Sequence, residues 1–204
     1  MYSLTMRFDL GEFATDLPAA EAALAPAAVK DVVGRAGVNI LRDHFFDLDR
    51  SRKNDLGGKR SHFYAAAARS TQFQTRSSGV LISINKVGIA QRFYGGSIRP
   101  VKAKVLTIPV RSEAYGKSPR EFTNLEVVFG KRGAIGLAER PSTDVNFGSR
   151  GVQPGQRRGG LLMYIFKTEV QQDPDPSVLP KDSEMSEGIL DALREAKEVA
   201  KLWQ

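Results

Sequence analysis

The stretch that decides the fold is PAAVKDVVGRAGVNILRDHFFDL, residues 26–48. Apolar side chains recur in it every three or four residues, which is the spacing of one face of an α-helix. Pro26 suits the first turn of such a helix, where its missing N–H costs nothing. Gly34 and Gly37 each weaken a helix by about 1 kcal/mol relative to alanine, so we expect them to permit close packing against a sheet or another helix.

The middle of the chain has the composition of antiparallel strands. Residues 79–87 and 104–111 are rich in β-branched side chains, and residues 125–129 and 134–138 flank a Gly-Lys-Arg-Gly turn. The connections are too short for helical crossovers, so the pairing is antiparallel. Residues 161–170 are the most apolar of these segments, and we place them inside the sheet.

Three further segments complete the predicted order of elements. Residues 1–13 alternate apolar and polar side chains, as a half-buried strand does. Ser61 is placed to cap a short helix that ends near Ser70. The last helix is predicted to begin near Asp182 and to end near Leu202.

These patterns predict an α+β fold, in which an antiparallel sheet packs against the long amino-terminal helix. We expect a single α+β domain over residues 1–180 and a carboxy-terminal helix over residues 181–204. Residues 141–160 are rich in glycine, arginine and polar side chains, and we interpret them as a mobile loop or an extended arm.

Composition excludes several kinds of chemistry. The chain has 204 residues and no cysteine, so it has no disulfide, thiolate nucleophile or cysteine-ligated metal. It contains no run of about 18 apolar residues, and its amino terminus lacks the layout of a signal peptide. We therefore expect a soluble protein that is made in the cytoplasm.

Charge separates the chain into three segments of alternating sign. Residues 1–49 carry 4 basic and 8 acidic side chains, residues 50–160 carry 21 and 6, and residues 161–204 carry 5 and 9. The net charges of the segments are therefore −4, +15 and −4. A basic centre attracts polyphosphate, and it attracts the acidic ends of a second copy as well. Charge alone leaves both partners open.

Residue types that carry catalysis are sparse and irregularly spaced. His44 and His62 are the only histidines, and the acids near them do not have the spacing of a defined metal site. The three Gly-Gly pairs lack the Lys-Ser/Thr ending of a phosphate-binding loop. No Gly-x-Ser-x-Gly occurs. We predict that the protein is not an enzyme and has no catalytic residue, cofactor or metal.

The segment VGIAQRFYGG at residues 87–96 interleaves aromatic, glycine and basic residues. Nucleic-acid bases stack on Phe or Tyr rings when nearby cations hold the phosphates. Alternatively, Phe93 and Tyr94 anchor the core or an interface, and we prefer this interpretation because aromatic side chains most often serve burial. Gly95 and Gly96 then form a subunit-contact turn at the end of a strand and let the backbone approach a neighbouring subunit closely.

Four quoted segments carry a resemblance to a known family. They are the small-residue helix VGRAGVNIL (33–41), the basic Gly-Gly loop after it, VGIAQRFYGG (87–96) and KVLTIP (104–109). Together they resemble the phage virion morphogenesis family, which groups with the tail-completion and head-to-tail joining proteins of tailed phages. The similarity spans roughly residues 27–140.

The resemblance implies a structural virion protein, a neck or tail-completion (tail-terminator) component that joins the tail to the head connector. Such a protein forms a homo-oligomeric ring, often a hexamer, at the neck or the top of the tail. It is assembled in the host cytoplasm, touches connector and tail tube or sheath proteins, and surrounds DNA in transit without contacting a membrane. A basic nucleic-acid-binding module is the alternative, and an unrecognised hydrolase is a third possibility.

Two groups of residues are the candidate sites. The residues assigned to subunit or partner contact are Arg92, Phe93, Tyr94, Gly95, Gly96, Arg99 and Lys102. The residues of a basic loop that would face DNA or an acidic partner are Arg50, Arg52, Lys53, Lys59 and Arg60.

Overall fold

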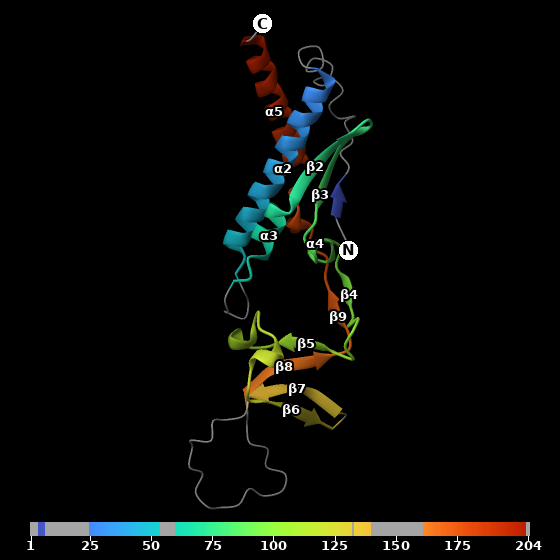
Figure 1. Cartoon of the computed structure of the whole chain (residues 1–204), viewed down its shortest axis with the longest axis vertical. Helices are drawn as coiled ribbons and strands as arrows, with labels where there is room; N and C mark the ends of the chain where they lie inside the picture. Colours follow the sequence, from blue (N-terminus) through green and yellow to red (C-terminus); the bar gives the residue numbers. More distant parts are fainter. Residues whose placement is uncertain (1–3, 7–24, 54–59, 132, 140–160, 203–204) are drawn as a thin grey trace, which may run out of the picture. The chain divides into compact units, whose positions relative to one another are not determined.

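The computed structural model describes residues 4–6, 25–53, 60–131, 133–139 and 161–202 (Figure 1). The chain divides into two compact units, each of which is described by itself. Unit 1 takes its residues from 1–52, 62–96 and 172–204, and unit 2 takes its residues from 53–61 and 97–171. The expectation of a single domain over residues 1–180 stays a prediction.

The fold class is confirmed as mixed α+β with antiparallel sheets. The elements of unit 1 are β1 (Leu4–Met6), α2 (Pro26–Ser51), α3 (Phe63–Arg69), β2 (Thr71–Arg76), β3 (Gly79–Ile84), α4 (Ile89–Tyr94), η4 (Pro176–Val178) and α5 (Asp182–Leu202). Those of unit 2 are β5 (Leu106–Pro109), η2 (Ser112–Ala114), η3 (Pro119–Glu121), β6 (Leu125–Gly130), β7 (Gly133–Glu139) and β8 (Leu161–Lys167). The short strands β4 (Gly96–Ile98) and β9 (Val170–Gln172) pair with each other, and each contains the boundary between the units.

Close packing explains the two glycines of α2. A Cβ atom on Gly34 would lie 2.2 Å from the ring of Phe73 on β2, and one on Gly37 would lie 2.5 Å from Ile82 on β3. At Gly34 the clash would be with the ring itself, so the position requires glycine, whereas at Gly37 the end of the Ile82 side chain would have to move. Figure 1 shows α2 between the β2–β3 hairpin and α5. The predicted helix and its close packing against a sheet are confirmed.

The core of unit 1 lies where α2, α5 and the β1–β3–β2 sheet meet. Leu41 and Phe45 of α2 are completely buried there. Helix α5 begins at Asp182 and ends at Leu202, as predicted, and it buries Met185 and Ile189 against this core.

In unit 2, one four-stranded antiparallel sheet has the order β5–β8–β7–β6. Strand β8 is paired on both sides, which confirms that residues 161–167 lie inside the sheet. The predicted hairpin at the Gly-Lys-Arg-Gly turn is confirmed by the pairing of β6 with β7. The described strands are nevertheless shared among three sheets, where a single sheet was predicted.

Some local predictions are wrong. Residues 89–94 form the short helix α4, where a strand and turn were expected, because Gly88 adopts a positive φ of 90° and starts a helical turn. The residue that precedes α3 is His62 and not Ser61, and its side chain makes no capping hydrogen bond. The long helix continues to Ser51, so Arg50 is helical and not part of a loop.

Other predictions lie beyond the described residues. The arm at residues 141–160 falls in the range 140–160 that the structure leaves undescribed, and so does most of the first predicted strand apart from Leu4–Met6. None of the described helices is long and apolar enough to cross a membrane.

Candidate functional site

Arg92, on α4, packs against aromatic rings of its own chain. Its Cζ atom lies 4.5 Å from the ring centroid of Phe63 and 5.5 Å from that of Tyr64, so the guanidinium makes cation–π contacts with both. The backbone carbonyl of Arg92 accepts a hydrogen bond from the N–H of Asp175 at 3.0 Å. Arg92 therefore contributes to the interior of unit 1, and its assignment to partner contact stays a prediction.

The neighbouring aromatic residues have different exposures. Phe93 packs against the core of unit 1, whereas 66% of Tyr94 is exposed. Their rings meet edge to face, with centroids 4.9 Å apart. Tyr94 is therefore the ring of this pair that offers surface to a partner.

Gly95 makes a close backbone approach within its own chain, and the predicted approach to a neighbouring subunit stays a prediction. Its φ is +68°, and a Cβ atom there would lie 2.5 Å from the backbone nitrogen of Pro174. The approached backbone belongs to the same chain. Gly96 also has a positive φ, +108°, but a Cβ atom there would meet only the side chain of Gln91, at 3.7 Å.

Arg99 and Lys102 lie in unit 2. Arg99 donates to Glu169, with Nη2 3.0 Å from Oε2. The hydroxyl of Ser97 also donates to Glu169, and Ser97 and Arg99 together lower the pKa of that carboxyl. Lys102 is exposed, so it is available to an acidic or phosphate-bearing partner.

The residues of the predicted basic loop do not all lie in one loop. Arg50 forms an ion pair with Asp47 within α2, and Lys53 and Arg60 are exposed on either side of the undescribed residues 54–59. Lys59 lies outside the described residues.

Arg52 is the centre of a hydrogen-bonded cluster in unit 1. Its Nη1 donates to the hydroxyl of Tyr64 at 2.6 Å and to Oδ2 of Asp175 at 2.5 Å, and its Nη2 donates to the hydroxyl of Ser177 at 2.5 Å. The hydrogen bond from Arg52 lowers the pKa of Asp175, and the same bond raises the pKa of Arg52. The cluster joins the end of α2 to α3 and to the segment before α5.

The two histidines have separate partners. The ring of His62 pairs with Asp49, whose other oxygen accepts from the backbone N–H of Ala65 at 3.2 Å. His44 makes a hydrogen-bond contact of 3.1 Å with the carbonyl of Ser177. Among the described residues, no three metal-ligating side chains converge.

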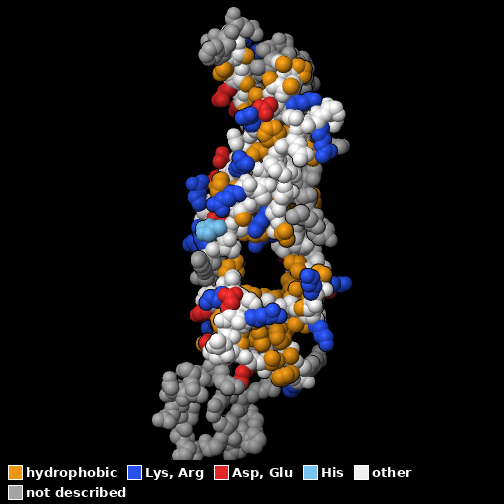
Figure 2. Space-filling model, in the orientation of Figure 1, with side chains coloured by type: hydrophobic (Ala, Val, Ile, Leu, Met, Phe, Trp, Pro, Cys, Tyr) orange, Lys and Arg blue, Asp and Glu red, His pale blue; other side chains and the backbone are white. Residues whose placement is uncertain are grey.

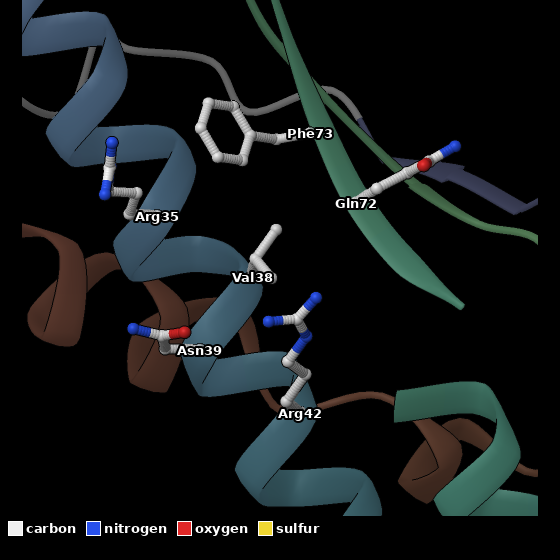
Figure 3. Close-up of a pocket in the computed structure, with 6 residues that line it drawn as sticks. All are labelled: Arg35, Val38, Asn39, Arg42, Gln72 and Phe73. Carbon is white, nitrogen blue, oxygen red and sulfur yellow. The ribbon is translucent and has the colours of Figure 1, made fainter. Parts of the chain in front are cut away.

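A pocket of about 390 Å³ lies between α2 and β2 in unit 1. Figure 3 shows Arg35, Val38, Asn39 and Arg42 on α2 and Gln72 and Phe73 on β2, with the Phe73 ring turned toward α2 and Gln72 turned away. Sequence reasoning missed this pocket. The signal was the spacing of Arg35, Asn39 and Arg42, which are polar positions four and three residues apart and so share one helix face.

Arg42 is incompletely hydrogen-bonded. Its Nη2 donates to the backbone carbonyl of Thr71 at 3.0 Å, but its buried Nε has no acceptor among the described residues. A buried donor without an acceptor costs about 1–3 kcal/mol. Arg35, on the same face, is exposed and paired with Asp31 at 2.7 Å.

Unit 2 exposes apolar side chains on its sheet. Val127 on β6 is 47% exposed, Ile135 on β7 is 46% exposed and Leu161 on β8 is 53% exposed. Figure 2 shows hydrophobic side chains gathered on this unit. Strand β6 is at the end of the sheet order and pairs with β7 alone among the described strands. An exposed apolar strand with an open edge is a template for pairing with another chain.

Comparison of the chain with protein-family models, with curated proteins and with solved structures gave no match.

Proposed function

We propose that this chain is a structural assembly protein that works through contacts with copies of itself and with neighbouring proteins. Its role is that of a neck or tail-completion component of a tailed phage, which forms a homo-oligomeric ring and joins the tail to the head connector. The phage role rests on the sequence resemblance over residues 27–140. The assembly role has independent support from the exposed apolar side chains of unit 2 and the hydrogen bonds of unit 1.

The observation that carries the assembly role is the open edge of unit 2. Val127 on the edge strand and Ile135 beside it each leave nearly half of their surface exposed. Burying such side chains gains about 25 cal/mol for each Å² of apolar area removed from water, and a partner strand would also satisfy the backbone groups at the edge of β6. A second copy or a neighbouring structural protein provides both.

The Arg52 cluster supports a structural interpretation of unit 1. Each donor of Arg52 that the structure records is used by Tyr64, Asp175 or Ser177 of the same chain. A charged group with partners of this kind fixes the position of elements. The cluster therefore holds α2, α3 and η4 in one arrangement.

The experiment is a measurement of molar mass in solution for the wild type and for two variants of the same sheet. Val127→Glu places a charge on the open edge at β6, and Thr107→Glu places one at an exposed position on β5, the opposite edge strand. We expect the wild type to form a closed oligomer, Val127→Glu to shift assembly to at least tenfold higher concentration, and Thr107→Glu to assemble as the wild type does. Equal behaviour of the two variants would contradict the role of β6.

The phage role has its own test. Disruption of the gene in the phage that carries it should give separate heads and tails in electron micrographs, and supplying the wild-type protein should restore joined particles. Complete infectious particles without the protein would overturn the phage role and leave the solution measurement unaffected.

Exposed cations favour nucleic-acid binding as the second candidate function. Lys102 and Lys104 are both exposed in the segment between β4 and β5, and such side chains contact phosphates without reading sequence. A monomer that binds duplex DNA, with an affinity that falls steeply as salt rises, would favour this candidate over the ring.

A further inference from the structure

We infer that the pocket between α2 and β2 receives carboxylates from helix α5 of a second copy of this chain. The inference rests on the self-assembly proposed above and names one of its interfaces. Three observations support it: the incompletely hydrogen-bonded guanidinium of Arg42, the acidic side chains of α5, and the similar spacing of these acids and the pocket arginines.

The pocket has the chemistry of a carboxylate receptor. Arg42 and Arg35 bring two guanidinium groups, of which that of Arg35 uses its Nε for Asp31, and Asn39 adds an amide donor. Arg42 uses one recorded hydrogen bond, to Thr71, and its Nε has no acceptor among the described residues. A carboxylate in the pocket would add a charged acceptor for the guanidinium of Arg42, which is incompletely hydrogen-bonded.

The edge of β2, beside the pocket, is not open to pairing with a further strand. Lys30 of α2 donates to the backbone carbonyls of Arg76 and Ser77 at 3.0 and 2.9 Å, and Arg42 donates to that of Thr71. Cations from α2 thus occupy carbonyl groups at both ends of β2, which protects this edge against strand addition.

Helix α5 carries an acidic stripe opposite its buried face. The exposed acids recur every three or four residues, and they are Glu184, Glu187, Asp191, Glu195 and Glu198. Asp191 pairs with Arg194 and Glu198 pairs with Lys201. Glu187 and Glu195 form no ion pair among the described residues, so their carboxylates are available to a partner.

The spacing of the acids matches that of the arginines. Glu187 and Glu195 are eight residues apart on α5, which is about 12 Å along a helix axis, and Arg35 and Arg42 are seven residues apart on α2, which is about 10.5 Å. At about 100° per residue, the two arginines lie within about 20° of each other around α2, and the two acids lie about 80° apart around α5. Glutamate side chains are long enough to span that offset, so two helices lying side by side can bring both acids toward the arginines.

A second copy is the occupant that this charge pattern favours. Each copy has one basic pocket and one acidic helix, and a ring brings such unlike surfaces of identical subunits together. Both sides of the contact are encoded by the same sequence, so one substitution changes every copy. Reversing the charge of either the pocket or the helix should weaken the contact between copies, and reversing both should restore it.

The experiment is a charge-swap cycle read by molar mass against protein concentration. We expect Arg35→Glu and Glu187→Lys each to raise the concentration needed for assembly about tenfold, and the double variant to recover most of that loss, because like charges that face each other repel. Arg42→Gln keeps donor groups, removes the charge and should also weaken assembly, which serves as the second variant if a larger change at this partly buried residue disturbs folding.

Two controls match the change in net charge. Arg69→Glu and Asp43→Lys alter exposed side chains of unit 1 outside the pocket lining, and both should assemble as the wild type does. If Arg35→Glu and Glu187→Lys both assemble at the wild-type concentration, this inference is overturned, but the proposed ring is not. A wild type that stays monomeric at every concentration would overturn both, and single variants that weaken assembly without rescue in the double variant would overturn the pairing.

Discussion

Units 1 and 2 of this chain differ in how completely they bury their apolar side chains. Among the described residues, unit 1 has a cluster of 16 buried residues, whereas the buried cluster of unit 2 consists of Ala114, Met163 and Tyr164. Unit 2 also exposes apolar side chains on neighbouring strands, including Val127 and Ile135. Unit 1 therefore buries its own apolar side chains more completely, and we expect the sheet of unit 2 to gain most from a partner.

The largest effect is expected from shortening a core side chain in unit 1. Phe45→Ala removes a completely buried ring from α2 and should lower the free energy of unfolding by about 4 kcal/mol, from lost burial and the cavity left behind. Met163→Ala in unit 2 should cost about 2 kcal/mol, because a small cluster can collapse around the change. Chemical denaturation followed by circular dichroism measures both. Equal losses of unfolding free energy would contradict the difference between the two cores.

A smaller effect is expected from adding one methyl group to a glycine. Gly95→Ala places a Cβ atom 2.5 Å from the backbone of Pro174 at a φ of +68° and should cost about 2–3 kcal/mol. The matched control is Gly116→Ala in unit 2, where φ is +75° and a Cβ atom meets nothing within 4 Å. The ψ of Gly95 is −156°, in a backbone region that is essentially restricted to glycine. Thermal unfolding of both variants therefore measures the clash and the added backbone strain at Gly95 together as their difference, and similar midpoints would contradict the close approach at Gly95.

The smallest effect concerns the Arg52 cluster and depends on pH. The pKa of Asp175 is lowered in the folded protein, mainly by the hydrogen bond from Arg52. A lowered carboxyl pKa adds stability above the unfolded pKa, near 4, and this stability is lost as pH falls through the folded pKa. Asp175→Asn should therefore cost about 1 kcal/mol at pH 7, a modest value because the ion pair is about one third exposed.

The measurement for this prediction is the free energy of unfolding of the wild type and Asp175→Asn at pH 7 and at pH 2.5. The difference between the proteins should shrink at the lower pH. A difference that stays the same at both pH values would show that the carboxylate charge of Asp175 does not stabilise unit 1.

The sequence predicted the elements whose formation depends on local patterns of residues. The spacing of Val29, Val33 and Leu41 predicted α2, and the turn between β6 and β7 predicted their hairpin, because local sequence determines both features. The tight packing at Gly34 and Gly37 was also predicted from the cost of glycine in a helix.

Features that depend on distant contacts were not predictable in the same way. Residues 89–94 have a strand-like composition, yet they form α4 because Gly88 has a positive φ and the Arg92 carbonyl bonds with the N–H of Asp175, which lies 83 residues further along the chain. The role of Arg52 depends on Tyr64 and Asp175, which only the fold brings together.

The pocket at Arg42 was missed for a related reason. Counting charge by segment placed α2 in an acidic part of the chain, and this average hid the fact that Arg35, Asn39 and Arg42 share one face of the helix. Reading charge by helical face would have found it.

The most direct test of assembly through copies of this chain is the molar mass of the wild-type protein measured by light scattering over a hundredfold range of concentration. We predict one closed oligomer that dissociates on dilution and with rising salt, since charged surfaces contribute to its contacts. A mass equal to that of the 22.4 kDa chain at every concentration would contradict this account.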